Sequence, residues 1–194
     1  MLLVRAENRL SQEEKVMTKM NNYRQAGSNM QNTQYLTHAA AIAAIYTVLT
    51  VIAAGFGLAN GAVQVRFSEA LTVLPFFTPA AVPGLAIGCL LSNILTGCAL
   101  PDIIFGTLAT LLGALGSYAL RRNRFLVSLP PIVANTLIIP FVLSYAYHIP
   151  GGIPYFMLTV GAGEVISCLF FGQVLISALS PVRNVLLDQG GSAM

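Results

Sequence analysis

Two long stretches of this chain, residues 34–120 and 125–181, carry almost no charge. Their charged side chains are Arg66, Glu69, Asp102 and Glu164. Of the 194 residues 56% are hydrophobic and 9% are charged, whereas about a quarter of the residues in soluble domains are charged. The sequence therefore predicts an all-α integral membrane protein. A charged group at the centre of a membrane helix costs roughly 2.5 to 3.5 kcal/mol, so these four residues are the first candidates for function.

Apolar windows predict six membrane spans, because about 20 helical residues at 1.5 Å per residue cross roughly 30 Å of hydrocarbon. The windows cover residues 35–56, 67–81, 84–95, 102–120, 131–147 and 154–179. The second and third are short, and Pro75, Pro79 and Pro83 predict that their helices bend or break. The expected architecture is a six-transmembrane-helix bundle over residues 34–180, between a polar tail at 1–33 and a second tail at 181–194.

The positive residues predict the orientation of this bundle. They flank the first, fourth, fifth and sixth spans: Arg5, Arg9, Lys15, Lys19, Arg24, Arg121, Arg122, Arg124 and Arg183. Because Lys and Arg near span ends are retained in the cytosol, both tails are expected there, in a multi-pass protein of the plasma membrane. Arg66, Glu69, Asp102 and His148 then lie on or near the outer face. This topological use of the basic residues argues against a nucleic acid as partner.

The polar N-terminal tail is expected to hold a short helix over residues 10–20 and to be loose elsewhere. Cys89, Cys98 and Cys168 lie in apolar runs without paired spacing, which predicts buried free thiols and no metal site. The chain has no phosphate-binding glycine loop, nucleophile elbow or metal-ligand motif. We therefore expect neither an enzyme nor a cofactor.

Glu164 is the strongest single candidate for binding a ligand. It lies about ten residues into its span, roughly 15 Å below the outer boundary, and that span has no basic residue. Gly161 and Gly163 leave room for a ligand or another helix. The alternative is a protonated carboxyl group that forms a hydrogen bond to a neighbouring helix.

Arg66 and Glu69 are three residues apart, so on a helix they share a face and can pair. They either neutralise each other at the outer interface or bind a polar solute. Asp102 follows Pro101 at the start of a span, where a carboxylate is an ordinary helix N-terminal residue, favoured by the helix dipole, and a capping role is expected for it. Asn93, towards the outer end of the third span, is a further ligand candidate, whereas Asn135 is expected to form a helix-packing hydrogen bond.

Two aromatic side chains at the outer end of the fifth span, Tyr145 and His148, fit either an interfacial aromatic belt or a stacking role. In the first span, small residues recur at four-residue spacing over Ala39, Ala40, Ala43 and Ala44. Such a face allows close helix contact, within the bundle or with another protein. Spacing alone favours packing inside the bundle.

Several blocks resemble the QueT family of queuosine-precursor transporters, which are substrate-binding (S) components of energy-coupling-factor (ECF) transporters. The blocks are residues 65–75, 78–84, 88–93, 102–110 and 163–164. The resemblance covers about residues 35–180, and the tail before Gln34 is longer than the family pattern.

The resemblance implies a six-helix protein that binds a 7-deazaguanine from outside, such as queuine or its aminomethyl or nitrile precursors. It implies docking on a transmembrane coupling subunit with two ATPase subunits. In similar S components an Ala-x-x-x-Ala face contacts the coupling subunit, so Ala39 with Ala43, or Ala40 with Ala44, becomes the expected coupling surface.

The chemistry of such a ligand suggests roles for the candidate residues. Adjacent N–H donors of the ring suit a carboxylate such as Glu164 or Glu69. Arg66 could bind the ring carbonyl, and Phe67, Tyr145 or His148 could stack on the ring. A cationic aminomethyl group would prefer a second carboxylate. The alternatives are an S component for another heteroaromatic vitamin, and a small membrane enzyme or scaffold.

Overall fold

The computed structural model describes residues 2–57, 66–148 and 150–182, and all elements within them are helical. The chain divides into two compact units, Met1–Thr37 and His38–Met194. The predicted C-terminal tail from Arg183 onwards lies outside the described residues.

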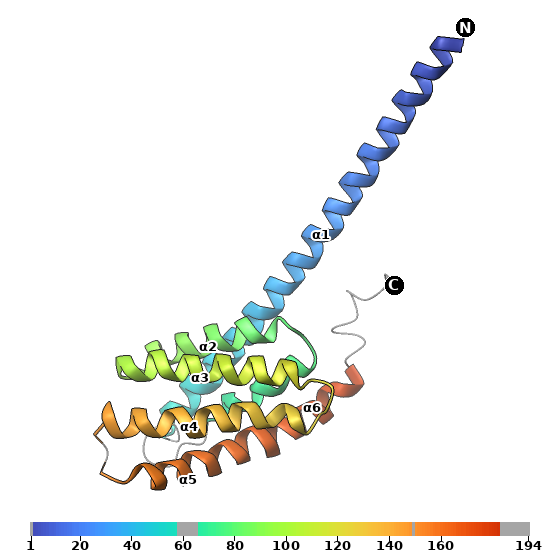
Figure 1. Cartoon of the computed structure of the whole chain (residues 1–194). Coiled ribbons are helices and arrows are strands. Elements are labelled where there is room, and N and C mark those ends of the chain that lie inside the picture. Colours follow the sequence, from blue (N-terminus) through green and yellow to red (C-terminus); the bar gives the residue numbers. More distant parts are fainter. Residues whose placement is uncertain (1, 58–65, 149, 183–194) are drawn as a thin grey trace. The chain divides into compact units, whose positions relative to one another are not determined.

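The first helix, α1 (Leu2–Gly55), begins in the N-terminal unit and ends in the second (Figure 1). The expectation of a short helix in an otherwise loose tail is therefore wrong. Residues 2–54 contain no proline and a single glycine, Gly27, so no residue blocks a continuous ladder of backbone hydrogen bonds.

The second unit continues with five further α-helices and four other helical segments. In chain order these are the 3-10 helix η1 (Phe67–Phe76), α2 (Ala81–Leu95), α3 (Leu100–Ala119), the 3-10 turn η2 (Leu126–Ser128), α4 (Leu129–Tyr145), α5 (Ile153–Glu164), the π-helical η3 (Val165–Phe171), α6 (Gly172–Leu179) and the 3-10 turn η4 (Ser180–Val182). Figure 1 shows α2, α3, α4 and α5 side by side, and each contacts the next.

Four helical segments are long and apolar enough to cross a bilayer: Gly27–Gly55, Leu100–Ala119, Leu126–Tyr145 and Ile153–Leu179. The apolar helices η1 and α2 are shorter. At about 2 Å and 1.5 Å per residue they extend roughly 20 Å and 22 Å, less than the hydrocarbon thickness of about 30 Å. The fold is that of a multi-pass membrane protein, and the count of six full spans remains a prediction.

The chain breaks where the prolines predict a break. The 3-10 helix η1 contains Pro75 and ends at Phe76, and α2 begins at Ala81. This start is three residues earlier than the sequence suggests. Pro83 is tolerated in the first turn of α2 because the backbone N–H that it lacks would have no helical partner there.

Close contact between α1 and α2 depends on small residues. A Cβ atom at Gly84 would lie 2.7 Å from the Ala39 carbonyl oxygen, and one at Gly88 would lie 3.0 Å from that of Ala43. Ala39 and Ala43 are each 5% exposed. Their expected role as a partner-coupling surface is therefore corrected: this face packs inside the chain, where glycines allow two backbones to approach.

The other two alanines of this run are exposed and not buried. Ala40 and Ala44 are exposed on the surface of α1. They share a face because residues four apart on a helix are neighbours.

Candidate functional site

Glu69 lies at the centre of the polar interior although its helix is apolar. It is 1% exposed. The hydroxyl of Tyr46 on α1 donates a hydrogen bond to Oε1, and the side-chain amide of Asn135 on α4 lies 3.5 Å from Oε2. Three elements therefore converge on one carboxylate, and Asn135 forms the helix-packing hydrogen bond expected of it.

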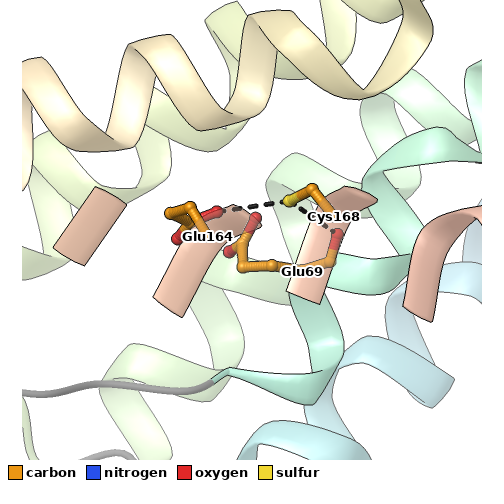
Figure 2. Close-up of side chains that lie close together, drawn as sticks. All are labelled: Glu69, Glu164 and Cys168. Carbon is orange, nitrogen blue, oxygen red and sulfur yellow. Dashed lines mark hydrogen bonds between the residues drawn. The ribbon is translucent and has the colours of Figure 1, made fainter. Parts of the chain in front are cut away.

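The side chains of Glu164 and Cys168 lie close to Glu69 (Figure 2). Both residues belong to the last long helical segment, Ile153–Leu179, which comprises α5, η3 and α6. Glu164 ends α5, and Cys168 lies in the π-helical η3, a conformation often found at functional sites. The Cys168 thiol lies 3.2 Å from Glu164 Oε2 and 3.4 Å from the backbone carbonyl of Glu69. Ligand atoms of the three side chains all lie within 4.8 Å of one another. We call Glu69, Glu164 and Cys168 the carboxylate cluster.

By donor type, the carboxylate cluster could bind a polar ligand or a metal ion. Carboxylate oxygens accept hydrogen bonds from N–H groups, and two carboxylates with a thiolate are also possible ligands of zinc. The burial of all three side chains separates them from bulk water, which strengthens either interaction.

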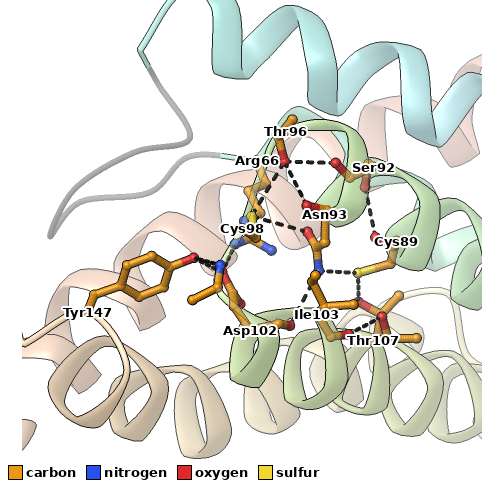
Figure 3. Close-up of polar contacts among 12 residues, drawn as sticks. Arg66, Cys89, Ser92, Asn93, Thr96, Cys98, Asp102, Ile103, Thr107 and Tyr147 are labelled. Carbon is orange, nitrogen blue, oxygen red and sulfur yellow. Dashed lines mark hydrogen bonds and ion pairs between the residues drawn. The ribbon is translucent and has the colours of Figure 1, made fainter.

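A second polar group surrounds Asp102 (Figure 3). Arg66 Nη2 lies 3.8 Å from Asp102 Oδ2, and the Tyr147 hydroxyl donates to the same oxygen at 2.9 Å. The Asn93 side-chain amide lies 3.4 Å from the Asp102 backbone carbonyl. We call Arg66, Asn93, Asp102 and Tyr147 the Asp102 cluster.

These contacts correct two expectations. Arg66 pairs with Asp102 and not with Glu69, because Arg66 precedes η1 in an extended conformation, with φ −97° and ψ 100°, so the helical spacing does not apply. Asp102 lies in the first turn of α3 but does not cap it. Ala99 is the residue at the N-cap, and it provides no side-chain capping bond.

The second carboxylate oxygen of Asp102 lies next to Gly106, which has no side chain. Asp102 is 3% exposed, and its Oδ1 has no hydrogen-bond partner among the described residues. A Cβ atom on Gly106 would lie 3.1 Å from this oxygen and 3.2 Å from Asn93 Nδ2. An added methyl group at Gly106 would therefore crowd both the Asp102 carboxylate and the Asn93 amide, so glycine allows these two side chains to pack against α3.

Cys89 lies between the two clusters. Its sulfur is 3.6 Å from Asn93 Nδ2 and accepts a hydrogen bond from the Thr110 hydroxyl at 3.3 Å. Cys89 also shares a buried cluster with Tyr46, whose hydroxyl binds Glu69. The buried polar side chains therefore form a connected path through the interior of the second unit.

Three aromatic candidates lie outside both clusters. Phe67 is 38% exposed and packs edge-on against Phe171, with ring centroids 5.5 Å apart. Tyr145 is 70% exposed, stacks on Phe141 and lines an apolar groove of about 450 Å³ between α3 and α4. His148 is exposed, with φ +50°. Stacking by these three side chains remains a prediction.

Sequence reasoning did not assign Tyr46, Asn135, Cys168 or Gly106 to the site. Tyr46 offers a weak signal, as a hydroxyl inside an apolar span, and Asn135 was interpreted as a packing residue. Cys168 and Gly106 have no local signal, because their importance comes from side chains on other elements.

The chain matches a known protein family. A family model described as QueT transporter matches residues 36–181. The Queuosine precursor transporter QueT of Lactococcus lactis subsp. cremoris (strain MG1363) is 36% identical over 72 residues, which are 37% of this chain and 42% of that protein. The aligned part is therefore less than half of this relative. No solved structure matches the chain.

Proposed function

This chain belongs to the QueT transporter family, and on that premise we propose that it captures a queuosine precursor at the outer face of the plasma membrane for import. Family membership makes the chain a transport protein and not an enzyme. The ligand we propose is a 7-deazaguanine, and the binding site comprises the carboxylate cluster and the Asp102 cluster.

The observation that carries this proposal is the concentration of carboxyl groups inside an apolar bundle. Glu69, Asp102 and Glu164 are 1%, 3% and 7% exposed. Burying an ion costs several kcal/mol unless partners compensate it, so such groups need a function. A 7-deazaguanine supplies suitable partners, because its ring N–H groups donate to carboxylates and its carbonyl accepts from donors such as Asn93 or Arg66.

Replacing Glu164 by Gln tests the site. We expect the dissociation constant for queuine and its aminomethyl precursor to rise at least about tenfold, because a hydrogen bond to a charged group contributes roughly 1.5 to 3 kcal/mol. The measurement is titration calorimetry on the purified protein in detergent micelles. Glu14→Gln, in the N-terminal unit outside the family match, is the matched control.

Unchanged affinity in Glu164→Gln would remove Glu164 from the site. If the wild-type protein binds no 7-deazaguanine but binds another heteroaromatic vitamin tightly, the substrate assignment fails. Native mass spectrometry of the purified protein identifies any small molecule that remains bound and decides between these ligands.

We further propose that the chain is an S component that works with an ECF transmembrane coupling subunit and two ATPase subunits. The exposed pair Ala40 and Ala44 on α1 supports a docking face, since small residues at four-residue spacing let a second helix approach closely. Ala39 and Ala43 cannot serve this role while they pack on α2.

Replacing Ala44 by Trp tests the docking face. The indole would hold a partner helix away, so we expect co-purification with the coupling subunit and cellular uptake to be lost, while ligand affinity stays within about twofold. Leu112→Trp, on the exposed face of α3, is the control. Normal assembly of Ala44→Trp would show that another surface contacts the partner.

A further inference from the structure

An apolar groove of about 720 Å³ runs along the outer surface of the last long helical segment, Ile153–Leu179. Residues four apart on a helix are neighbours and form ridges, so two rows of side chains line this groove. One row comprises Val165, Leu169 and Gln173, and the other comprises Ile166, Phe170 and Val174. Phe170 is 63% exposed and Val174 is 55% exposed. Because the segment is a candidate membrane span, these side chains face the hydrocarbon of the bilayer.

One end of this groove is polar and holds a positive charge. Arg124, in the connection between α3 and α4, donates from Nε to Gln173 Oε1 at 3.2 Å and from Nη2 to the Ser177 hydroxyl at 2.9 Å. Both acceptors line the groove. The Gln173 side-chain amide also donates to the Arg124 carbonyl oxygen at 2.6 Å. These contacts fix the guanidinium of Arg124 at the end of the groove.

The guanidinium of Arg124 has further donors for an anion. A guanidinium carries five N–H groups, and the two hydrogen bonds to Gln173 and Ser177 use two of them. Arg124 is exposed, as is Arg122 two positions earlier. The planar fork of an arginine matches the geometry of a phosphate group. This end of the groove is therefore complementary to a phosphate in charge and in geometry.

The length of the groove corresponds to one leaflet of a bilayer. Val165 and Ser177 are twelve positions apart, which is roughly 18 Å along a helix, and one leaflet contributes about 15 Å of hydrocarbon. Arg121, Arg122 and Arg124 predict that the polar end lies at the cytosolic interface, where anionic lipids attract basic residues. An acyl chain along the groove and a phosphate at its end thus fit a single molecule.

We propose that this groove binds one anionic phospholipid of the cytosolic leaflet. One acyl chain lies between the two rows of apolar side chains, and the phosphate binds Arg124 and Arg122. The site is separate from the carboxylate cluster, because Glu164 and Cys168 of the same segment are buried and the groove lies on its exposed side.

Tryptophan fluorescence tests the occupant, because the chain contains no tryptophan. Phe170→Trp places a reporter in the groove, and Leu112→Trp, at a site 48% exposed on α3, is the matched control on the general lipid-facing surface. The full chain is reconstituted in phosphatidylcholine vesicles, with brominated phosphatidylglycerol or brominated phosphatidylcholine as the quencher.

At Phe170→Trp, phosphatidylglycerol should bind about 5- to 30-fold more tightly than phosphatidylcholine, the effect of one to two arginines at an anionic headgroup. At Leu112→Trp the preference should be less than about twofold. Equal affinities of the two lipids at Phe170→Trp overturn the proposal, and so does the same preference at both reporters.

Variants of the arginines locate the phosphate. In the Phe170→Trp background, Arg124→Gln should lower the preference for phosphatidylglycerol about fivefold, whereas Arg124→Lys should stay within about twofold of the parent because the charge is kept. Arg121→Gln is the matched control, since the Arg121 guanidinium lies over the Tyr118 ring, 4.3 Å from its centroid. An unchanged preference in Arg124→Gln overturns the placement of the phosphate. If that variant does not fold, the comparison of the two lipids at Phe170→Trp still decides the proposal.

Two further measurements distinguish other occupants of the groove. Soluble glycerol phosphate in large excess should leave quenching by brominated phosphatidylglycerol unchanged, and displacement of the lipid would overturn the proposal in favour of a site for free phosphate. If neither brominated lipid quenches Phe170→Trp in the protein isolated with the subunits that co-purify with it, a partner helix occupies the groove, which also overturns the proposal.

Discussion

Arg66 and Glu69 are near neighbours in the chain but have different partners. Arg66 lies before η1 and forms its ion pair with Asp102 on α3, whereas Glu69 accepts hydrogen bonds from Tyr46 on α1 and Asn135 on α4. Each side chain therefore joins elements that are distant in sequence. The Arg66–Asp102 pair connects η1 to α3 at the end of the helix where Tyr147 also binds.

A double-mutant cycle tests the Arg66–Asp102 pair. Arg66→Met should lower the free energy of unfolding by about 3 kcal/mol, because it leaves Asp102 buried without its cation. The double variant Arg66→Met with Asp102→Asn should lose about 1 to 3 kcal/mol less than the sum of the single variants. Denaturation in mixed micelles gives these free energies.

The control is a second double-mutant cycle, which combines Arg66→Met with Glu69→Gln. Its coupling energy should be clearly smaller, because Glu69 is held by Tyr46 and Asn135. A larger coupling with Glu69 than with Asp102 would contradict the ion pair seen in the structure.

Among the helices, the contact between α1 and α2 positions the carboxylate cluster. Gly84 and Gly88 let α2 lie against the backbone of α1, and the Thr47 hydroxyl lies 3.2 Å from the Gly88 carbonyl oxygen. Tyr46, on the same part of α1, donates to Glu69. The small residues thus set the position from which α1 reaches the binding site.

Replacing Gly88 by Ala tests this arrangement. A Cβ atom there would lie 2.8 Å from the Tyr46 Cβ and 3.0 Å from the Ala43 carbonyl oxygen, so the helices must separate. We expect the free energy of unfolding to fall by about 1 to 3 kcal/mol, the usual cost of overpacking, and ligand affinity to fall because Tyr46 moves. Gly55→Ala is the control, and equal stability of the two variants would show that the interface adapts freely.

The segment Ile153–Leu179, which comprises α5, η3 and α6, also positions the carboxylate cluster. The π-helical η3 between α5 and α6 holds Cys168 next to both Glu164 and the Glu69 carbonyl. Gly172, at the start of α6, packs on Val73 of η1, where a Cβ atom would lie 2.7 Å from its side chain. Close packing of this segment on η1 therefore brings the two glutamates together.

For the second unit taken as a whole, the arrangement is an apolar bundle around a connected polar interior. Exposed leucine, isoleucine and valine side chains cover α2, α3 and α4, whereas Glu69, Asn93 and Glu164 are buried. Apolar outside and polar inside is the arrangement expected of a membrane protein that binds a polar ligand.

The orientation of this unit gives a prediction of its own. Arg121, Arg122 and Arg124 between α3 and α4 predict a cytosolic connection, so the connection between α4 and α5 should face outwards. A membrane-impermeant maleimide should label Gly152→Cys in intact cells and Asn123→Cys only in inside-out vesicles. The parent protein reports the background from Cys98, and the reverse labelling pattern would overturn the topology.

The sequence by itself determined the class of protein and its family. Sparse charge and apolar windows indicated a helical membrane protein, and the proline positions indicated the break between η1 and α2, because these properties depend on single residues and local spacing. The blocks at 65–75, 88–93 and 102–110 also indicated the family, which its match over residues 36–181 confirms.

Only the tertiary structure decided which of these residues meet. Local spacing suggested that Arg66 pairs with Glu69 and that Asp102 caps a helix, but the ion pair forms between Arg66 and Asp102. Ala39 and Ala43 became internal because α2 brings glycines opposite them. Glu69 and Glu164, 95 positions apart in the numbering, come together because packing of the last helical segment on η1 joins them, and no local pattern in the chain encodes that contact.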